Sequence, residues 1–211
     1  MRRWITCALS AMALLALSNA GAADLVEGRD YTRLKGPQPT DKKIEVIEFF
    51  SYGCPHCNDL EPYVQAWLKK VPPDVQFRRV PVEFQDRWAS LAKVYFTLEA
   101  MGEDVRLSPE VFKAIHGSGL PLYQDKAFFD WAASKGLDRA KVADVYNSFG
   151  VDSKMKRARA AVQEYRIDSV PTLLVDGKFM TSSSRLAGGH AAVPLALDEL
   201  VAKARAERPK T

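Results

Sequence analysis

The sequence predicts an α/β fold in which a sheet domain is interrupted by a block of helices. The first observation is Ile44–Phe50, an apolar run rich in β-branched and aromatic residues, which is typical of a strand covered on both faces. The second is a change of pattern over 87–150, where apolar residues recur at helical spacing. The third is the return of strand patterns at 172–180.

Four elements are predicted ahead of the helical block. We expect a short edge strand at 31–34, the covered strand at 44–50, a helix at 55–70 and a further strand at 75–82. Pro62 lies inside that helix and predicts a kink, because proline removes a backbone donor and crowds the preceding turn.

Within the block, glycines predict where helices end. We expect ends at Gly102, Gly117, Gly136 and Gly150, with a helix that starts at Ser108-Pro109, the pattern of an N-cap followed by proline at the first helical position. After the block we expect a long helix at 152–167, a strand at 172–175, a hairpin turn at Asp176-Gly177 into a strand at 178–180, and a closing helix at 191–206.

The N-terminus has the pattern of a cleaved signal peptide. Two arginines precede an apolar stretch at 5–17 that is short for a membrane span, and Ala20-Gly21-Ala22 offers a small-residue cleavage site. An uncleaved anchor or a core helix is the alternative. We therefore expect a signal peptide at 1–22, a sheet domain in two parts at 23–85 and 151–211, and a helical insertion domain at 86–150.

Charge and cysteine content narrow the class of protein. The chain holds 30 Lys and Arg against 26 Asp and Glu, and Arg2 and Arg3 belong to the predicted leader. The positive and negative charges of the mature chain are therefore nearly equal in number, which does not indicate a nucleic-acid partner. Cys7 leaves with the leader. Only Cys54 and Cys57 remain, in a compartment where disulfides persist.

Three interpretations of Cys54-Pro55-His56-Cys57 are open. A structural disulfide that closes so short a loop stabilises a fold by only about 2 kcal/mol. A zinc site needs about four nitrogen or sulfur ligands, and the other histidines, His116 and His190, are isolated in the sequence. A redox pair fits better, because it stands where a strand meets a helix.

The redox interpretation assigns a role to each residue of the tetrad. Pro55 starts the helix, so free N–H groups and the positive helix end face the first sulfur and lower the pKa of its thiol. His56 adds a cation or a hydrogen-bond donor. We therefore expect Cys54 to be the exposed nucleophile and Cys57, one turn inward, to be the resolving thiol.

Glu48 is a carboxylate in the middle of the predicted central strand. Burial there is costly and raises the pKa of a carboxyl group, which suits an acceptor and donor of the Cys57 proton. The alternative is an exposed position at a strand edge. Pro171 precedes a predicted strand. On residue type alone, a proline at this position is an ordinary transition from a loop to a strand and does not indicate a function.

The segments “EFFSYGCPHC” and, far downstream, “VPT”, with a leader before them and a helical block between them, resemble the DsbA family of periplasmic disulfide oxidoreductases, thioredoxin-fold proteins with a helical insertion. The similarity extends over nearly the whole mature chain and includes “YTRL”, “YNSFG” and “VDGKF”. The tetrad joined to a Val-Pro pair is a specific combination.

The resemblance implies further roles. Cys54 would be the low-pKa nucleophile, His56 its stabiliser, Cys57 the buried partner and Glu48 the buried acid. Pro171 would be a cis-proline that faces the active site, and Val170 would present its backbone to an extended substrate. Tyr52-Gly53 stand where better-known members carry bulkier apolar residues, so a different rim of the substrate surface is expected.

The implied function is that of a monomeric periplasmic enzyme that donates the Cys54–Cys57 disulfide to reduced, folding exported proteins. A quinone-linked membrane oxidase resembling DsbB would reoxidise it. No cofactor or metal is expected, since the cysteine pair holds the electrons. The alternatives are a disulfide reductase or isomerase, a glutathione-dependent isomerase or transferase of the same fold, and a chaperone-like module that binds clients without using its cysteines.

Overall fold

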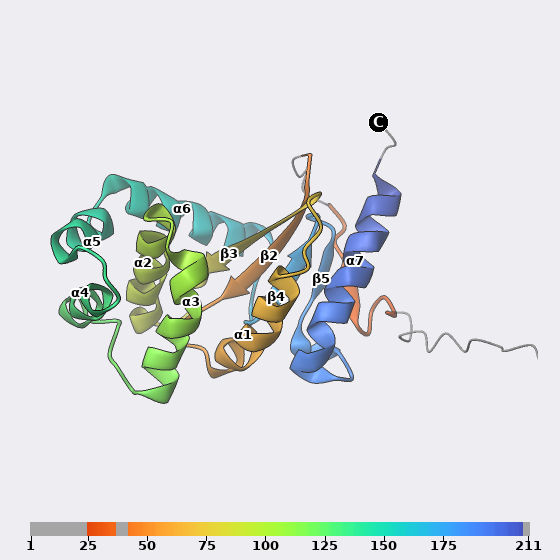
Figure 1. Cartoon of the computed structure of the whole chain (residues 1–211). Helices are drawn as coiled ribbons and strands as arrows, with labels where there is room; N and C mark the ends of the chain where they lie inside the picture. The colour runs from red at the N-terminus through yellow and green to blue at the C-terminus, as the bar shows by residue number, and fades with distance from the viewer. Residues whose placement is uncertain (1–24, 37–41, 209–211) are drawn as a thin grey trace, which may run out of the picture.

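The computed structural model describes residues 25–36 and 42–208, so the predicted signal peptide, 1–22, lies outside the described residues. A five-stranded mixed sheet forms the centre of the molecule (Figure 1), in the order β1-β5-β4-β2-β3. Its strands are β1 (Tyr31–Arg33), β2 (Ile44–Phe50), β3 (Val75–Pro81), β4 (Thr172–Val175) and β5 (Phe179–Thr181). β2 runs parallel to β3 and antiparallel to β4. β5 runs antiparallel to both of its neighbours, β4 and β1. All five predicted strands are present.

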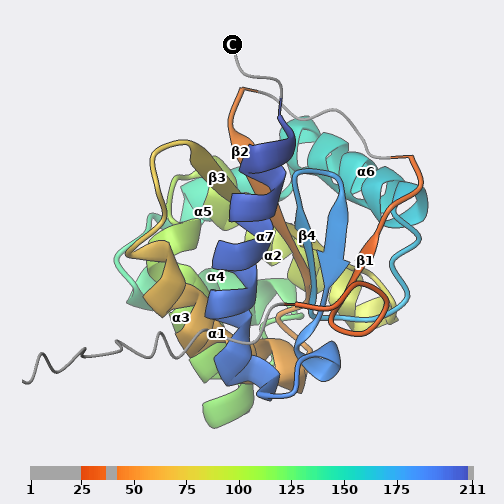
Figure 2. The same cartoon turned by 90° about the vertical axis from the view of Figure 1, so that its right-hand side faces the viewer.

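The side chains of β2 alternate between two apolar cores. Val46 packs with residues of α1 (Pro55–Leu68) and α7 (Val193–Glu207), whereas Ile47 and Phe49 belong to the core shared with the helical block. In Figure 2, α1 and α7 lie side by side across one face of the sheet. Every residue of β2 except Glu45 is buried, as the apolar run predicts. The chain therefore leaves β2 from the interior, at the point where the cysteines follow.

The helical block is an insertion between β3 and β4. It contains α2 (Asp86–Ala100), α3 (Asp104–Phe112), α4 (Asp125–Ser134), α5 (Arg139–Tyr146) and α6 (Phe149–Glu164), with a π-helical turn at Lys113–Gly117. Figure 1 shows α2 to α5 on one side of the sheet, and α6 contacts both α2 and β3. The α/β fold with a helical insertion is thus confirmed. No helix in the described part of the chain has the length and apolar character needed to cross a membrane.

The predicted start of a helix at Ser108-Pro109 is wrong. Gly102, with φ of 73°, ends α2, and the chain enters α3 at Asp104 almost at once. Pro109 therefore lies inside α3. The Ser108 hydroxyl does not cap a helix, because it is hydrogen-bonded to the hydroxyl of Tyr52 (2.7 Å).

The predicted helix end at Gly150 is also wrong. α5 ends at Tyr146, and the Ser148 hydroxyl accepts the backbone N–H of Val151 (3.3 Å), which makes Ser148 the N-cap of α6. Gly150 lies in the first turn of α6. The predicted hairpin is confirmed: Asp176 and Gly177 have φ of 55° and 63°, as a two-residue turn of this hand requires. Short 3₁₀ turns at Ser183–Arg185 and Gly189–Ala192 connect β5 to α7.

Candidate active site

The two cysteines lie where β2 is followed by α1. Cys54 is the N-cap of α1 and Pro55 opens the helix, as predicted. The Cys54 side chain accepts no cap hydrogen bond from the helix, but the backbone N–H groups of His56 and Cys57 lower the pKa of its thiol. This arrangement follows from the sequence, since a helix N-terminus leaves its first N–H groups without partners inside the helix.

The surroundings separate the two thiols in acidity. The pKa of Cys54 falls to about 6, chiefly because the Cys57 thiol donates a hydrogen bond to its sulfur, with further help from the backbone N–H groups and from His56, while burial opposes the shift. Burial raises the pKa of Cys57, and the nearby Cys54 and Glu48 add to that effect. At neutral pH the pair therefore holds one thiolate, on Cys54, and one thiol, on Cys57.

The prediction that Cys54 is exposed is wrong in degree. Cys54 is 5% exposed and Cys57 is fully buried, so only one edge of the Cys54 side chain reaches the surface. The loop before β4 covers part of it: the carbonyl of Val170 lies 3.7 Å from the Cys54 sulfur. The Val170–Pro171 peptide bond is cis, the configuration that the resemblance implies.

Glu48 is not at a strand edge; it is fully buried in β2, an interior strand of the sheet that lies between β4 and β3. Its neighbour in register on β3 is Arg79, whose Nε–H donates to Glu48 Oε2 (2.7 Å). The same guanidinium also donates to Glu61 of α1. Sequence reasoning placed Glu48 in the interior but expected no cation beside it.

This buried group has one carboxylate in excess of its cation. Burial raises the pKa of Glu61, and although burial alone lowers the pKa of Arg79, the two carboxylates outweigh it and raise that pKa above the ordinary value. Glu48 Oε1 has no hydrogen-bond partner among the described residues. The sequence analysis did not identify Glu61 and Arg79 as residues of the site. Two signals pointed to them: an arginine in the strand next to β2, and a glutamate one helical turn after Cys57.

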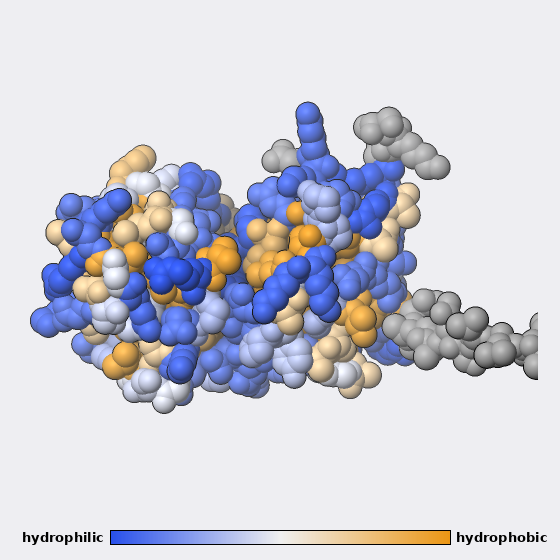
Figure 3. Space-filling view, in the orientation of Figure 1, coloured by the Kyte–Doolittle hydropathy of each residue, from blue (hydrophilic) through white to orange (hydrophobic). Residues whose placement is uncertain are grey.

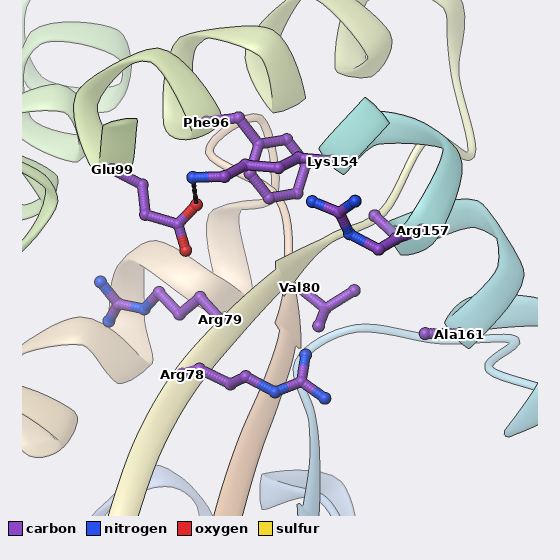
Figure 4. A pocket seen from close by; sticks show the side chains of 9 residues that line it. Arg78, Arg79, Val80, Phe96, Glu99, Lys154, Arg157 and Ala161 are labelled. Carbon is purple, nitrogen blue, oxygen red and sulfur yellow. Dashed lines mark hydrogen bonds and ion pairs between the residues drawn. The ribbon is translucent and has the colours of Figure 1, made fainter. Parts of the chain in front are cut away.

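Arg79 also borders two hollows. One, of about 350 Å³, lies between α1 and α3 and is lined by Leu68, Phe77 and Val105 among others; apolar side chains gather around the hollow of this face in Figure 3. The other, of about 370 Å³, lies between β3, α2 and α6 (Figure 4). Its basic side chains largely have carboxylate partners already, such as Glu99 for Lys154. Neither hollow is lined by Cys54 or Cys57.

Both histidines that are isolated in the sequence lie at the redox loop. The ring N–H of His190 donates to the carbonyl of His56 (3.1 Å), and the two rings stack with centroids 6.3 Å apart. The ring N–H of His116 donates to the carbonyl of Tyr52 (2.8 Å). Among the described residues, no three His, Cys, Asp or Glu side chains form a group that could hold a metal ion. The histidines thus contact the backbone of the loop.

The expected change of rim at Tyr52-Gly53 is not made by the Tyr52 side chain. Tyr52 is 1% exposed and points into the helical block, where its ring packs edge-on against Phe50 and Phe112. Gly53 is required by a close approach: a Cβ there would lie 2.5 Å from Nε1 of Trp88. Trp88 of α2 therefore stands directly beside the redox loop, a contact that its helical spacing alone did not predict.

Comparison with known proteins agrees with this geometry. The family model described as a DSBA-like thioredoxin domain matches residues 45–193. The thiol:disulfide interchange protein DsbA of Pseudomonas aeruginosa is 37% identical over 212 residues, which cover 100% of both chains. Its counterpart in Burkholderia cepacia is 38% identical over 185 residues, which cover 86% of this chain and 87% of that one.

Solved structures show the same architecture. The crystal structure of Pseudomonas aeruginosa DsbA has a TM-score of 0.81 at 37% identity and covers 88% of this chain and 97% of that one. Reduced DsbA1 from Neisseria meningitidis has a TM-score of 0.77 at 28% identity and covers 88% and 97%. With the Cys54–Cys57 pair at the start of α1, the chain belongs to the DsbA family of thiol:disulfide oxidoreductases, and its activity is thiol:disulfide interchange.

Proposed function

We propose that the chain works as a disulfide donor, which oxidises reduced, folding proteins in the periplasm. The observation that carries this direction is the lowered pKa of Cys54. A thiol with pKa of about 6 in place of 9.0 stabilises the reduced form at pH 7 by about 1.4 kcal/mol, which makes the pair about 30 mV more oxidising. A protein whose reduced form is favoured gives its disulfide away.

The exchange takes place in two balanced steps. A client thiolate attacks the sulfur of Cys54, the Cys54–Cys57 bond breaks, and Cys57 takes up a proton because burial disfavours its thiolate. A second client thiolate then attacks the client sulfur of the mixed disulfide, and Cys54 leaves as the stabilised thiolate. The client dithiol loses two electrons and two protons. The cysteine pair gains both electrons, Cys57 takes up one proton, and the other proton goes to solvent because Cys54 leaves as a thiolate.

The remaining site residues assist these steps. Glu48 is the buried acid that exchanges the proton with Cys57, and its free Oε1 supports this role. The backbone of Val170, whose carbonyl lies beside Cys54, aligns an extended client segment, with Pro171 in the same loop. His56 stabilises the thiolate. A Glu48→Gln variant tests the first role, since exchange kinetics unchanged across pH would exclude it.

The proposal includes location, partners and domain division. Residues 1–22 direct export and are removed, the mature protein is a periplasmic monomer, and a DsbB-like quinone-linked membrane enzyme reoxidises it. The thioredoxin domain comprises 23–85 and 151–211, with 86–150 as the insertion domain, so the boundary falls in the first turn of α6, the helix that contacts both α2 of the insertion and β3 of the sheet. N-terminal sequencing of the exported protein is expected to begin near Ala23; an intact Met1 would contradict cleavage.

Direct transfer to a protein client tests the activity itself. The oxidised protein is mixed with reduced, unfolded ribonuclease A, and we expect stoichiometric loss of client thiols. Cys54→Ser and Cys57→Ser are both expected to be inactive with the reduced client, because neither variant can form the disulfide that is donated. Faster reduction of disulfides than oxidation of thiols would favour a reductase or isomerase, and client binding that survives loss of both cysteines without disulfide formation would favour a chaperone-like module.

A further inference from the structure

His116 is the one histidine of residues 86–150, and its side chain reaches from the helical block to the redox loop. It lies in the π-helical turn at Lys113–Gly117 that follows α3. Single π-helical turns are rare and occur frequently at functional sites. The ring Nε2 of His116 lies 2.8 Å from the carbonyl oxygen of Tyr52, 64 residues earlier in the chain. Neither step of the exchange gives this contact a role.

The chemistry of the acceptor fixes the direction of this hydrogen bond. A backbone carbonyl oxygen can only accept, so Nε2 of His116 carries the hydrogen and donates it. Both the neutral ring in this tautomer and the cation can do so. The ring is also held from the side, because it stacks on Phe112 (centroids 6.2 Å apart), which packs edge-on against the ring of Tyr52 (5.0 Å). The histidine is therefore fixed in the position from which it donates.

The peptide that accepts this bond leads directly into Cys54. Its N–H, on Gly53, donates to the hydroxyl of Ser51 (3.1 Å), and the N–H of Cys54 donates to the Ser51 carbonyl (3.1 Å). Gly53 has the greatest backbone freedom of any residue type and adds no side chain that could anchor the loop. The hydrogen bond from His116 therefore holds the most flexible point between β2 and α1 from its oxygen side.

The orientation of this peptide decides where the Cys54 sulfur lies. Cys54 is the N-cap of α1, with φ of −91° and ψ of 118°, so its side chain follows the backbone that enters the helix. Cys57 is fully buried within α1 and cannot follow a displaced loop. A loop that moves therefore separates the two sulfurs, and the hydrogen bond from the Cys57 thiol is the chief cause of the lowered pKa of Cys54. A contact remote from the sulfur can thus set its reactivity.

We propose that His116 is a positioning residue for the redox pair: its Nε2–H holds the Tyr52 carbonyl and thereby keeps the Cys54 sulfur at the N-terminus of α1. The helical insertion then takes part in the redox chemistry, because α3 and the turn that carries His116 both contact α1. The inference rests on the proposed function for its direction, since loss of the contact is expected to make a disulfide donor less oxidising.

Two replacements of His116 in the mature protein separate the hydrogen bond from the packing of the ring. Glutamine carries an N–H at similar reach, whereas leucine has a similar volume and no donor. In His116→Leu we expect the midpoint of Cys54 ionisation, followed by absorbance at 240 nm, to rise by about 0.5 to 1 pH unit. The equilibrium with glutathione at pH 7 should then shift about 3- to 5-fold toward the disulfide of the protein, because the reduced form loses thiolate stabilisation. His116→Gln is expected to stay near the wild type in both measurements.

Ser148→Ala is the matched control for a general loss of stability in the same block. It removes the hydroxyl that caps α6, next to the end of α5, and is expected to lower the free energy of unfolding without changing the midpoint or the equilibrium. NMR of the histidine ring nitrogens in the wild-type protein needs no variant. A neutral His116 is expected to carry its hydrogen on Nε2, and a hydrogen on Nδ1 would overturn the inference even if His116→Leu does not fold.

The outcomes separate this inference from the proposed function. Wild-type values in His116→Leu, equal shifts in His116→Leu and His116→Gln, or the same shifts in Ser148→Ala would overturn the positioning role while the disulfide donor stands. A wild-type equilibrium as reducing as that of thioredoxin would overturn the proposed function. The difference between His116→Leu and His116→Gln would still decide whether His116 positions the pair.

Discussion

Replacing Arg79 with methionine tests the buried charge group behind the cysteines. The substitution keeps an apolar stem of similar reach but leaves Glu48 and Glu61 in the interior without a cation. Removing one partner of a buried ion pair costs about 3–5 kcal/mol, because the remaining charge has lost both water and its partner. That is a large part of the total stability of a domain of this size.

Arg78→Met is the matched control on the same strand. Arg78 pairs with Glu45, and both side chains are partly open to solvent (39% and 24% exposed), so this loss is expected to cost about 0–1 kcal/mol. Urea unfolding of the reduced proteins, followed by circular dichroism at pH 7, gives both values. A third protein, Arg79→Met with Glu48→Gln and Glu61→Gln, is expected to recover much of the stability, because no buried charge remains.

The pH dependence of Arg79→Met follows from the same reasoning. Burial already raises the pKa of Glu61, and the loss of Arg79 removes a group that opposes this rise, so the carboxyl takes up a proton more readily in the variant. The deficit in stability should therefore be smaller at pH 5 than at pH 7. Equal losses for Arg78→Met and Arg79→Met, or a triple variant no more stable than Arg79→Met, would refute the account.

Three further predictions concern the cysteine loop. Absorbance at 240 nm should show the Cys54 thiolate appearing with a midpoint near pH 6. Cys57→Ala should raise this midpoint more than Cys57→Ser, because serine keeps a hydrogen-bond donor. An unchanged midpoint in Cys57→Ala would contradict the hydrogen bond from the Cys57 thiol. Because folding lowers the pKa of Cys54, the free energy of unfolding of the reduced protein should rise by about 2–3 kcal/mol relative to that of the oxidised protein between pH 5 and pH 8. Parallel pH profiles of the two unfolding free energies would contradict the lowered pKa. Gly53→Ala should cost about 1–3 kcal/mol and change the fluorescence of Trp88, since a Cβ would overlap the indole; wild-type values for both would contradict the close approach.

Local pattern predicted most of the fold because each strand and turn carries its own signal. The covered strand at Ile44–Phe50, the Asp176-Gly177 turn and the helix opened by Pro55 were all correct. The errors arose where tertiary contacts decide. Ser108 resembled an N-cap in sequence, but its hydroxyl is bonded to Tyr52, a residue 56 positions earlier.

The active site was predictable as far as it lies within one segment. Cys54, His56 and Cys57 belong to a single turn, so their relation followed from helix geometry. Glu61 and His190 come from different elements, and only the fold brings them to the tetrad. A buried carboxylate in β2 predicts that some partner exists, but not that Arg79 of the neighbouring strand supplies it. His190 gave no periodic or spacing signal.

The redox equilibrium of the mature protein with defined glutathione buffers tests the central claim most directly, with Cys54→Ser as the control that cannot form the disulfide. A disulfide donor is expected to have a potential between about −180 and −120 mV, the upper value being that known for the DsbA oxidase, and a reduced form more stable than its oxidised form. A potential near −270 mV, as in thioredoxin, would contradict the account and assign the chain to a reducing pathway.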